Sequence, residues 1–197
     1  MSKTVTENPL EKFNHYWDKA KQHSPLSQKS AVNISTVDPQ GFPQSRFVDL
    51  KEVHKQGLVF CTRFDSSKGK DIELNNKVAL TAWWDHIGIQ IRVSGVAHKT
   101  SVQASDQYWN SRSQSARVIS ILSKQSHVLD DPHALYEQVD NELASNPGRE
   151  LARPDNWGGY LIEPVKVEFL TFKKSRLHVR ELFTKTQQTW SYCLLHP

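Results

Sequence analysis

The chain has 197 residues, of which 37% are hydrophobic, 10% aromatic and 23% charged. This length and aromatic content exclude a wholly disordered chain and allow a packed core without disulfides. No apolar run approaches the ~20 residues of a membrane-spanning helix, and residues 1–5 are not followed by the apolar stretch of a secretory signal. We therefore expect a cytoplasmic protein that does not bind membranes.

The formal net charge of +4 favours anionic ligands. The basic residues are dispersed rather than gathered in a stripe, so we expect small phosphorylated ligands and no nucleic acid. Cys61 and Cys193 lack Cys-x-x-Cys spacing, and the nine histidines show no metal-ligand pattern, so we expect no metal site and two buried thiols. No Gly-x-Ser-x-Gly motif supports a hydrolase triad.

The N-terminal segment predicts one helix. Asn8 can cap it and Pro9 suits its first position, and apolar residues then recur at helical spacing at Leu10, Phe13, Trp17 and Ala20. A polar stretch, residues 24–30, follows. We expect residues 1–30 to form a helix and linker, and residues 31–197 to form the main part of a single domain. The helix either covers that domain or reaches a partner subunit.

The next segments read as strands. Residues 31–37 are rich in β-branched side chains, and turns at residues 38–41 and 54–57 lead to further strands at 44–51 and 58–62, which makes an antiparallel meander. A short helix is expected after residues 65–69, ending near 75–76. Two more strands are expected, at residues 78–84 and 87–98, the second with strict alternation of apolar and polar residues.

Helices and then strands complete the chain. A capping box at residues 100–103 predicts a helix through Arg112. A second helix is expected at residues 115–124. A third is expected to begin at Asp131-Pro132 and to stop at Asn146-Pro147-Gly148. The remaining strands are expected at residues 159–163, 165–172, 176–184 and 189–195. Strands and helices in separate blocks predict a mainly antiparallel β fold, a barrel or sheet with appended helices.

Two basic segments are candidate anion sites. If residues 176–180 form a strand, Arg176, His178 and Arg180 share one face of it. Leu177 and Val179 then lie buried on the other face. The basic face either contacts an anion or is a solvent-exposed edge. Residues Arg46 and Lys51 are five apart, so in a flat strand they point to opposite faces. They can share one ligand only across a bulge or at a subunit boundary, and otherwise form an exposed edge.

Three further motifs have alternative interpretations. The Ser66–Gly69 segment precedes a helix. Its hydroxyl, backbone N–H and ammonium groups together suit a phosphate. Alternatively, the segment is an ordinary helix cap. Tyr108 and Arg112 lie one helical turn apart and either hold a phosphate together or form a surface pair. Trp157, before Gly158-Gly159, either lies against a flat ring or fills the core.

Taken in order, these segments resemble the pyridoxamine 5′-phosphate oxidase family over nearly the whole chain. The residues that carry the resemblance are Arg46…Lys51, Thr62, Ser66-Ser67-Lys68-Gly69, Gln90, Tyr108…Arg112, Ser123-Lys124-Gln125-Ser126, Trp157-Gly158-Gly159-Tyr160 and Arg176-Leu177-His178-Val179-Arg180. The resemblance implies an FMN-binding split β-barrel, a homodimer with FMN at its interface, and oxidation of pyridoxamine or pyridoxine 5′-phosphate to pyridoxal 5′-phosphate, with O₂ as acceptor and hydrogen peroxide as product.

The resemblance also implies roles for individual residues. The residues expected to contact FMN are Arg46, Val48, Lys51, Thr62, Ser67, Lys68, Gln90, Gln125, Ser126, Trp157 and Arg180. Those expected to hold the substrate are Lys51, Tyr108, Arg112 and Ser115, with Arg176 and His178 as catalytic residues over the pyridine ring.

The chain departs from the family pattern at four positions. Ser67 stands where arginine is usual, Cys61 where tyrosine is usual, Ala116 where serine is usual, and Asp49 where an apolar residue is usual. Ser115 or Arg117 is the candidate replacement for the missing serine. These departures leave two alternatives to the oxidase: a paralogous flavin oxidoreductase with another small-molecule substrate, and a non-catalytic flavin-binding protein.

Overall fold

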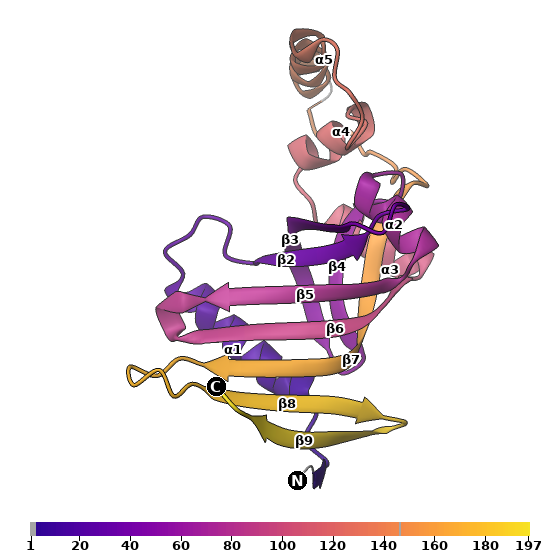
Figure 1. The fold of residues 1–197 in the computed structure, drawn as a ribbon. Coiled ribbons are helices and arrows are strands. Elements are labelled where there is room, and N and C mark those ends of the chain that lie inside the picture. The colour runs from indigo at the N-terminus through magenta and orange to yellow at the C-terminus, as the bar shows by residue number, and fades with distance from the viewer. Residues whose placement is uncertain (1–2, 146) are drawn as a thin grey trace.

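The fold is a closed antiparallel β-barrel with a hairpin and helices attached (Figure 1). The computed structural model describes residues 3–145 and 147–197. Within these residues the strand order is β1-β9-β8-β7-β4-β3-β2-β5-β6, and β7 also pairs with β6, which closes a six-stranded barrel. The strands are β1 (Lys3–Val5), β2 (Ala31–Val37), β3 (Pro43–His54), β4 (Gly57–Arg63), β5 (Lys77–Trp84), β6 (Ile89–Lys99), β7 (Trp157–Thr171), β8 (Val179–Thr186) and β9 (Thr189–Leu195). The expected antiparallel β fold with appended helices is confirmed.

The helices are attached at different places on the barrel. Figure 1 shows α4 and α5 projecting from one end, while β8 and β9 lie at the other. The helices are α1 (Pro9–His23), α2 (Ser67–Leu74), α3 (Val102–Asn110), α4 (Gln114–Leu122) and α5 (Pro132–Ser145), with a 3₁₀ turn η1 (Asp85–Ile87). No helix of the described segments is long and apolar enough to cross a membrane.

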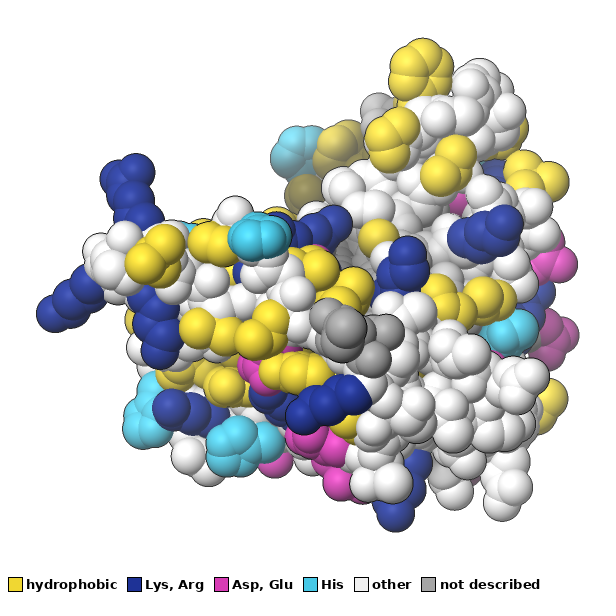
Figure 2. Space-filling model, turned by 60° about the horizontal axis from the view of Figure 1, so that its bottom comes forward, with side chains coloured by type: hydrophobic (Ala, Val, Ile, Leu, Met, Phe, Trp, Pro, Cys, Tyr) yellow, Lys and Arg dark blue, Asp and Glu magenta, His cyan; other side chains and the backbone are white. Residues whose placement is uncertain are grey.

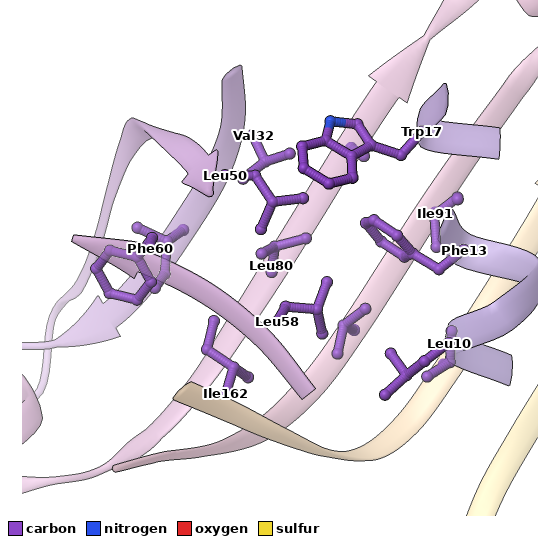
Figure 3. Packing of buried hydrophobic residues seen from close by; sticks show 14 of the residues in the cluster. Leu10, Phe13, Trp17, Val32, Leu50, Leu58, Phe60, Leu80, Ile91 and Ile162 are labelled. Atoms are coloured by element: carbon purple, nitrogen blue, oxygen red, sulfur yellow. The ribbon is translucent and has the colours of Figure 1, made fainter. Parts of the chain in front are cut away.

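The N-terminal helix α1 covers the barrel. The Asn8 side chain accepts a hydrogen bond from the Leu10 N–H and caps the helix. The predicted apolar face (Leu10, Phe13, Trp17 and Ala20) is buried in the main core cluster together with residues of the barrel strands. Figure 3 shows Phe13 and Leu10 directed toward the barrel interior. Full burial of a leucine or phenylalanine side chain such as Leu10 or Phe13 contributes about 1.5–3 kcal/mol, so α1 belongs to the main core.

A second core cluster attaches α3 and α4 to the start of β7. It contains Trp109, Val118, Leu151 and Trp157. The Trp109 indole donates a hydrogen bond to the Leu151 carbonyl at 2.6 Å and packs edge-on against Trp157 at 5.0 Å between ring centroids. This cluster fixes where the helical arm, which we define as α4 and α5, leaves the barrel.

Two predicted strand boundaries were wrong. Residues 159–163 and 165–172 are one strand, β7, because Pro164 lies opposite Gly95 at a register shift in the pairing with β6, where a missing N–H is tolerated. The strand expected from residue 87 begins at Ile89, because η1 and the left-handed Gly88 (φ 70°) precede it.

The prediction of a strand through residues 176–180 was also wrong. Arg176 has a φ of 64°, its N–H donates to the Lys173 carbonyl, and β8 begins only at Val179. Arg176 and His178 therefore lie in a turn and do not share a strand face with Arg180. The expected burial of the alternate residues fails for the same reason, since Leu177 is 69% exposed and Val179 is 37% exposed.

Smaller differences concern element ends. The cap of α3 is Ser101, whose hydroxyl accepts from the Ala104 N–H, rather than Thr100. The expected stop of the third helix at Asn146 lies outside the described residues. The strand β1 was not predicted; it is three residues long and pairs with β9. Cys61 and Cys193 are half-buried rather than buried.

Candidate functional site

A first group of polar residues lies at the α2 end of the barrel, and we call it the α2 cluster: Thr36, Arg46, Thr62, Ser66, Lys68 and Asp71. Its centre is Asp71, 4% exposed, which accepts a hydrogen bond from the Thr36 hydroxyl at 2.6 Å and pairs with the Arg46 guanidinium at 3.5 Å. The Lys68 ammonium donates to the Thr62 hydroxyl at 3.1 Å. The cluster therefore holds two cations and one buried carboxylate.

Burial lowers the pKa of both cations. Desolvation, together with the neighbouring Arg46 charge, lowers the pKa of Lys68 to about 8, against the opposing effect of Asp71. Desolvation also lowers the pKa of Arg46, while Asp71 raises it. A buried ammonium held mainly by hydroxyl groups is stabilised by any anion that reaches it. These donors fit the phosphate of a nucleotide.

At the start of α2, the backbone of Gly69 lies close to the Phe64 carbonyl, beside the α2 cluster. The Ser66 hydroxyl caps the helix by accepting from the Gly69 N–H. A Cβ on Gly69 would lie 2.2 Å from the Phe64 carbonyl oxygen, so only glycine allows this approach. Ser67, the first residue of α2, is exposed at the helix N-terminus, where the helix dipole favours an anion.

The segment after α4 reaches the same end of the barrel. The Thr62 hydroxyl donates to the Gln125 side-chain carbonyl at 3.3 Å, and Ser126 follows in an exposed left-handed conformation with φ 71°. The Arg63 guanidinium fixes this segment, because it donates to the carbonyls of Ser120 and Ser123, both at 2.8 Å. Two of the expected flavin contacts, Gln125 and Ser126, therefore lie beside the α2 cluster.

A second group, which we call the α3 cluster, lies on the opposite face of β4 from Thr62: Asp49, Lys51, Glu52, Cys61, Tyr108 and Arg112. The pairing of β3 with β4 shifts between Leu50 and Glu52, so Lys51 is the extra residue of a β-bulge. Bulges re-aim side chains, and this one directs Lys51 toward Asp49. It does not join Lys51 to Arg46, which lies in the α2 cluster.

Helix α3 supplies the other half of the α3 cluster. The Tyr108 hydroxyl donates to Glu52 at 2.6 Å, and Arg112 donates to the Ser120 hydroxyl at 2.8 Å. Burial raises the pKa of the Cys61 thiol to about 12, although the Lys51 and Arg112 charges oppose that shift. This thiol is therefore unreactive at neutral pH. The predicted helix through Arg112 was wrong at its end, because α3 stops at Asn110 with Ser111 as its C-cap, so Arg112 lies beyond the helix and not on one helix face with Tyr108. Lys51, Tyr108 and Arg112 nevertheless all lie close enough to Cys61 to interact with it electrostatically.

Three other expected contacts are Trp157, Ser115 and Val48, of which Trp157 contacts the α3 cluster. Trp157 is 3% exposed, and the Arg112 guanidinium lies 4.9 Å from its ring centroid, so its ring fills the second core and supports Arg112. Ser115 is exposed in the first turn of α4, where its hydroxyl is 3.1 Å from that of Ser113. Val48 is half-buried and packs against the main core from β3.

A third group, the β8 cluster, lies on β6, β7 and β8: Gln90, Arg92, Glu168 and Arg180. Glu168 is 8% exposed and accepts hydrogen bonds from Arg180 at 2.8 Å and from Arg92 at 3.3 Å. The Glu168 carboxylate raises the pKa of Arg180. Gln90 pairs with Leu170, which in turn pairs with Arg180, so both lie in one row across the sheet.

The turn before β8 carries Arg176 and His178. Arg176 is exposed. The His178 imidazole accepts a hydrogen bond from the Lys173 N–H at 3.1 Å and packs edge-on against Phe172 at 5.6 Å. These contacts fix the tautomer and orientation of the His178 ring.

The α2 cluster and the β8 cluster do not meet within one chain. Thr62 pairs with Gly158 at the start of β7, whereas Gln90 pairs with Leu170, twelve residues further along the same strand. At ~3.3 Å per residue this is a path of about 40 Å along β7, longer than a flavin mononucleotide. Figure 1 likewise shows α2 beside the start of β7, with β8 lying along the other part of that strand.

Sequence patterns did not indicate the acidic partners of these cations. Asp71 and Glu168 are buried carboxylates on a helix and a strand, and Glu52 follows the bulge. The only sequence signal was that a group of cations needs counter-charges. Among the described residues no group of three metal-binding side chains occurs, and Figure 2 shows lysine and arginine dispersed over the face that it presents.

Comparison with known proteins identifies the family. Residues 19–141 match the family model "Pyridoxamine 5'-phosphate oxidase", and residues 157–197 match "Pyridoxine 5'-phosphate oxidase C-terminal dimerisation region". A pyridoxine/pyridoxamine 5′-phosphate oxidase of Haemophilus influenzae is 41% identical over 93% of this chain and 87% of its own.

Solved structures show the same architecture. PhzG from Burkholderia lata, in complex with tetrahydrophenazine-1-carboxylic acid, has a TM-score of 0.90 at 27% identity and covers 96% of this chain and 93% of its own. A pyridoxamine 5′-phosphate oxidase-related, FMN-binding protein from Nostoc punctiforme has a TM-score of 0.80 at 18% identity, covering 98% of this chain and 100% of its own.

Fold and site together define a split β-barrel protein with basic clusters suited to phosphorylated ligands. The chain belongs to the pyridoxamine 5′-phosphate oxidase family. This membership makes it an FMN-dependent oxidoreductase and confirms the family resemblance.

Proposed function

We propose that this protein is an FMN-dependent oxidase of the cytoplasm that converts pyridoxamine or pyridoxine 5′-phosphate to pyridoxal 5′-phosphate. O₂ would be the electron acceptor and hydrogen peroxide the product. The observation that carries the proposal is that this family member has two separate clusters of cationic and hydroxyl donors, each able to contact one phosphate. A flavin nucleotide and a phosphorylated substrate together need two such sites.

The α2 cluster is the proposed site for the FMN phosphate. Arg46 and Lys68 supply the positive charge, and the Ser67 hydroxyl lies at the N-terminus of α2. Charge-assisted hydrogen bonds of this kind contribute about 1.5–3 kcal/mol each. Bound FMN would supply the redox chemistry, accepting a hydride from the substrate and returning electrons to O₂. Val48, Lys51, Thr62, Gln90, Gln125, Ser126, Trp157 and Arg180 are the further proposed contacts.

The α3 cluster is the proposed site for the substrate phosphate. Lys51, Tyr108 and Arg112 lie on elements that face one another, and Trp157 supports the Arg112 guanidinium. Ser115 is the proposed fourth contact. Arg176 and His178 would lie over the pyridine ring and orient its reacting carbon toward the flavin. The protein's task is then positioning and charge matching.

A homodimer is the arrangement that the geometry supports. The β8 cluster and the α2 cluster lie at opposite ends of β7, so one FMN can contact both only if a second chain supplies one of them. The match of residues 157–197 to a dimerisation region supports this. The opposite-face placement of Arg46 and Lys51 favours the same conclusion.

A second candidate is an oxidation of a different small molecule on the same fold. PhzG, which matches at 27% identity, was crystallised with a tricyclic carboxylic acid. Asp49 and Cys61, which depart from the expected pattern, both lie in the α3 cluster, the proposed substrate site. A non-catalytic flavin-binding protein is the third candidate.

Oxygen consumption by the purified yellow protein tests the proposal. Pyridoxamine 5′-phosphate and pyridoxine 5′-phosphate are expected to be oxidised with release of one peroxide each. A flavin that is bleached by dithionite and reoxidised by air, with no turnover of either vitamer, would instead support the second or third candidate. Protein purified without flavin and unable to bind added FMN would contradict all three.

A further inference from the structure

Two carboxylates already occupy donors of the proposed substrate-phosphate site. The Lys51 ammonium is paired with Asp49, and the Tyr108 hydroxyl donates to Glu52 at 2.6 Å. Both acids come from β3, and both contact groups that would otherwise be free for the phosphate. The inference that follows rests on the proposed function, because it takes Lys51, Tyr108 and Arg112 as the substrate anchor.

The β-bulge explains how three successive polar residues serve one site. Asp49 and Lys51 are two residues apart and share a strand face. The pairing shift between Leu50 and Glu52 makes Lys51 an extra residue, so Glu52 also reaches α3. A regular strand would direct Glu52 to the opposite face.

The formal charges of the cluster cancel. Lys51 and Arg112 contribute two positive charges, and Asp49 and Glu52 contribute two negative charges. A phosphate dianion entering this neutral site would add two negative charges within a few ångströms of both acids. The Asp49–Lys51 pair is partly solvated, with side-chain exposures of 49% and 34%. Separating Lys51 from Asp49 therefore costs little free energy, but the negative charge of Asp49 remains beside the site.

We infer that Asp49 and Glu52 are specificity-determining residues. They weaken the binding of the phosphate dianion at the α3 cluster relative to the singly charged, protonated form of the same phosphate group. Tyr108 and Arg112 still donate to such a group, while Lys51 stays paired with Asp49. The site then discriminates by charge, independently of the ring that is oxidised.

Calorimetric titration of the FMN-loaded protein with inorganic phosphate tests this inference. The variants are Asp49→Asn and Glu52→Gln, which keep an acceptor oxygen for the neighbouring donor. Each is expected to bind phosphate about threefold more tightly than the unmodified protein. The matched control is Asp18→Asn, because Asp18 pairs with Lys21 at nearly the same exposures, 53% and 34%. This control is expected to leave phosphate binding unchanged.

Steady-state kinetics give a second readout. Both variants are expected to lower KM for pyridoxine 5′-phosphate and to leave KM for unphosphorylated pyridoxine unchanged. Phosphate binding that is unchanged, weaker or absent in both variants would overturn the inference and make the acids positioning residues. If the protein holds no FMN, the proposed function fails. The same phosphate titration in a Lys68→Met background, which disables the α2 cluster, then still tests the two acids.

Discussion

Lys68 shows how burial turns one side chain into a pH-sensitive anion site. Its ammonium is 7% exposed, and desolvation lowers its pKa to about 8. A neutral amine cannot pair with a phosphate. A bound phosphate would therefore restore the ordinary, higher pKa of this lysine, and flavin binding would take up a proton at slightly alkaline pH.

We predict that FMN affinity falls as the pH rises from 7 to 9. Above about pH 8 the dissociation constant should increase by up to about tenfold per pH unit, because one proton is bound with the flavin. Fluorescence-quenching titrations at a series of pH values measure this. Lys68→Arg should bind FMN without this pH step. A step of equal size in both proteins would show that another group titrates.

Replacement of Gly69 should destabilise α2. A Cβ at this position would lie 2.2 Å from the Phe64 carbonyl oxygen, which is backbone and cannot rotate away. We predict that Gly69→Ala lowers the free energy of unfolding by about 3 kcal/mol or more, as measured by chemical denaturation. Lys70→Ala, an exposed change in the same helix, should change it by less than about 0.5 kcal/mol.

At the scale of elements, the helical arm depends on one arginine. Arg63 lies on β4 and is 8% exposed. Its guanidinium donates to two backbone carbonyls at the end of α4. The Asp65 carboxylate accepts from the Nε and Nη2 atoms of Arg63 at 2.9 and 2.7 Å. Side-chain hydrogen bonding to Arg63 lowers the pKa of Asp65 to about 2. The arm is thus attached to the barrel by a charge-assisted fork.

We predict that Arg63→Lys loosens the segment after α4. Lysine cannot make the forked contacts, so backbone amides of residues 113–127 should exchange hydrogen at least about tenfold faster, and FMN affinity should fall because Gln125 is no longer held beside Thr62. Hydrogen exchange by mass spectrometry checks this. Arg149→Ala, which removes an exposed pair with Glu142, should leave residues 113–127 unchanged.

Sequence patterns predicted the elements where local rules and burial agree. Alternation marked β6, and the cap at Asn8 marked the start of α1. The rules failed where a long-range contact decided the outcome. Pro164 continues β7 because it faces a register shift in the pairing with β6. At Arg176 the cause is local instead, because its positive φ of 64° and the hydrogen bond from its N–H to the Lys173 carbonyl form a turn. The bulge at Lys51 is set by its partner strand, which no local pattern reveals.

At the scale of the whole molecule, the separation of the clusters makes cooperation between chains testable. We predict that Lys68→Met and Arg180→Ala each lose most oxidase activity alone. Unfolding and refolding a mixture should restore about a quarter of it, because half of random dimers are hybrids and each hybrid has one intact site. Activity of the refolded mixture is the measurement. A mixture as inactive as its components would place the complete site within one chain.

The position of β7 in the chain has a consequence for synthesis on the ribosome. This strand pairs with β4, β6 and β8, but it is translated after both β4 and β6. Until then β4 and β6 have open edges, which are prone to pairing with other chains. The nascent protein therefore has to remain an unclosed sheet for most of its translation, and an early stop before Trp157 would release a fragment prone to aggregation.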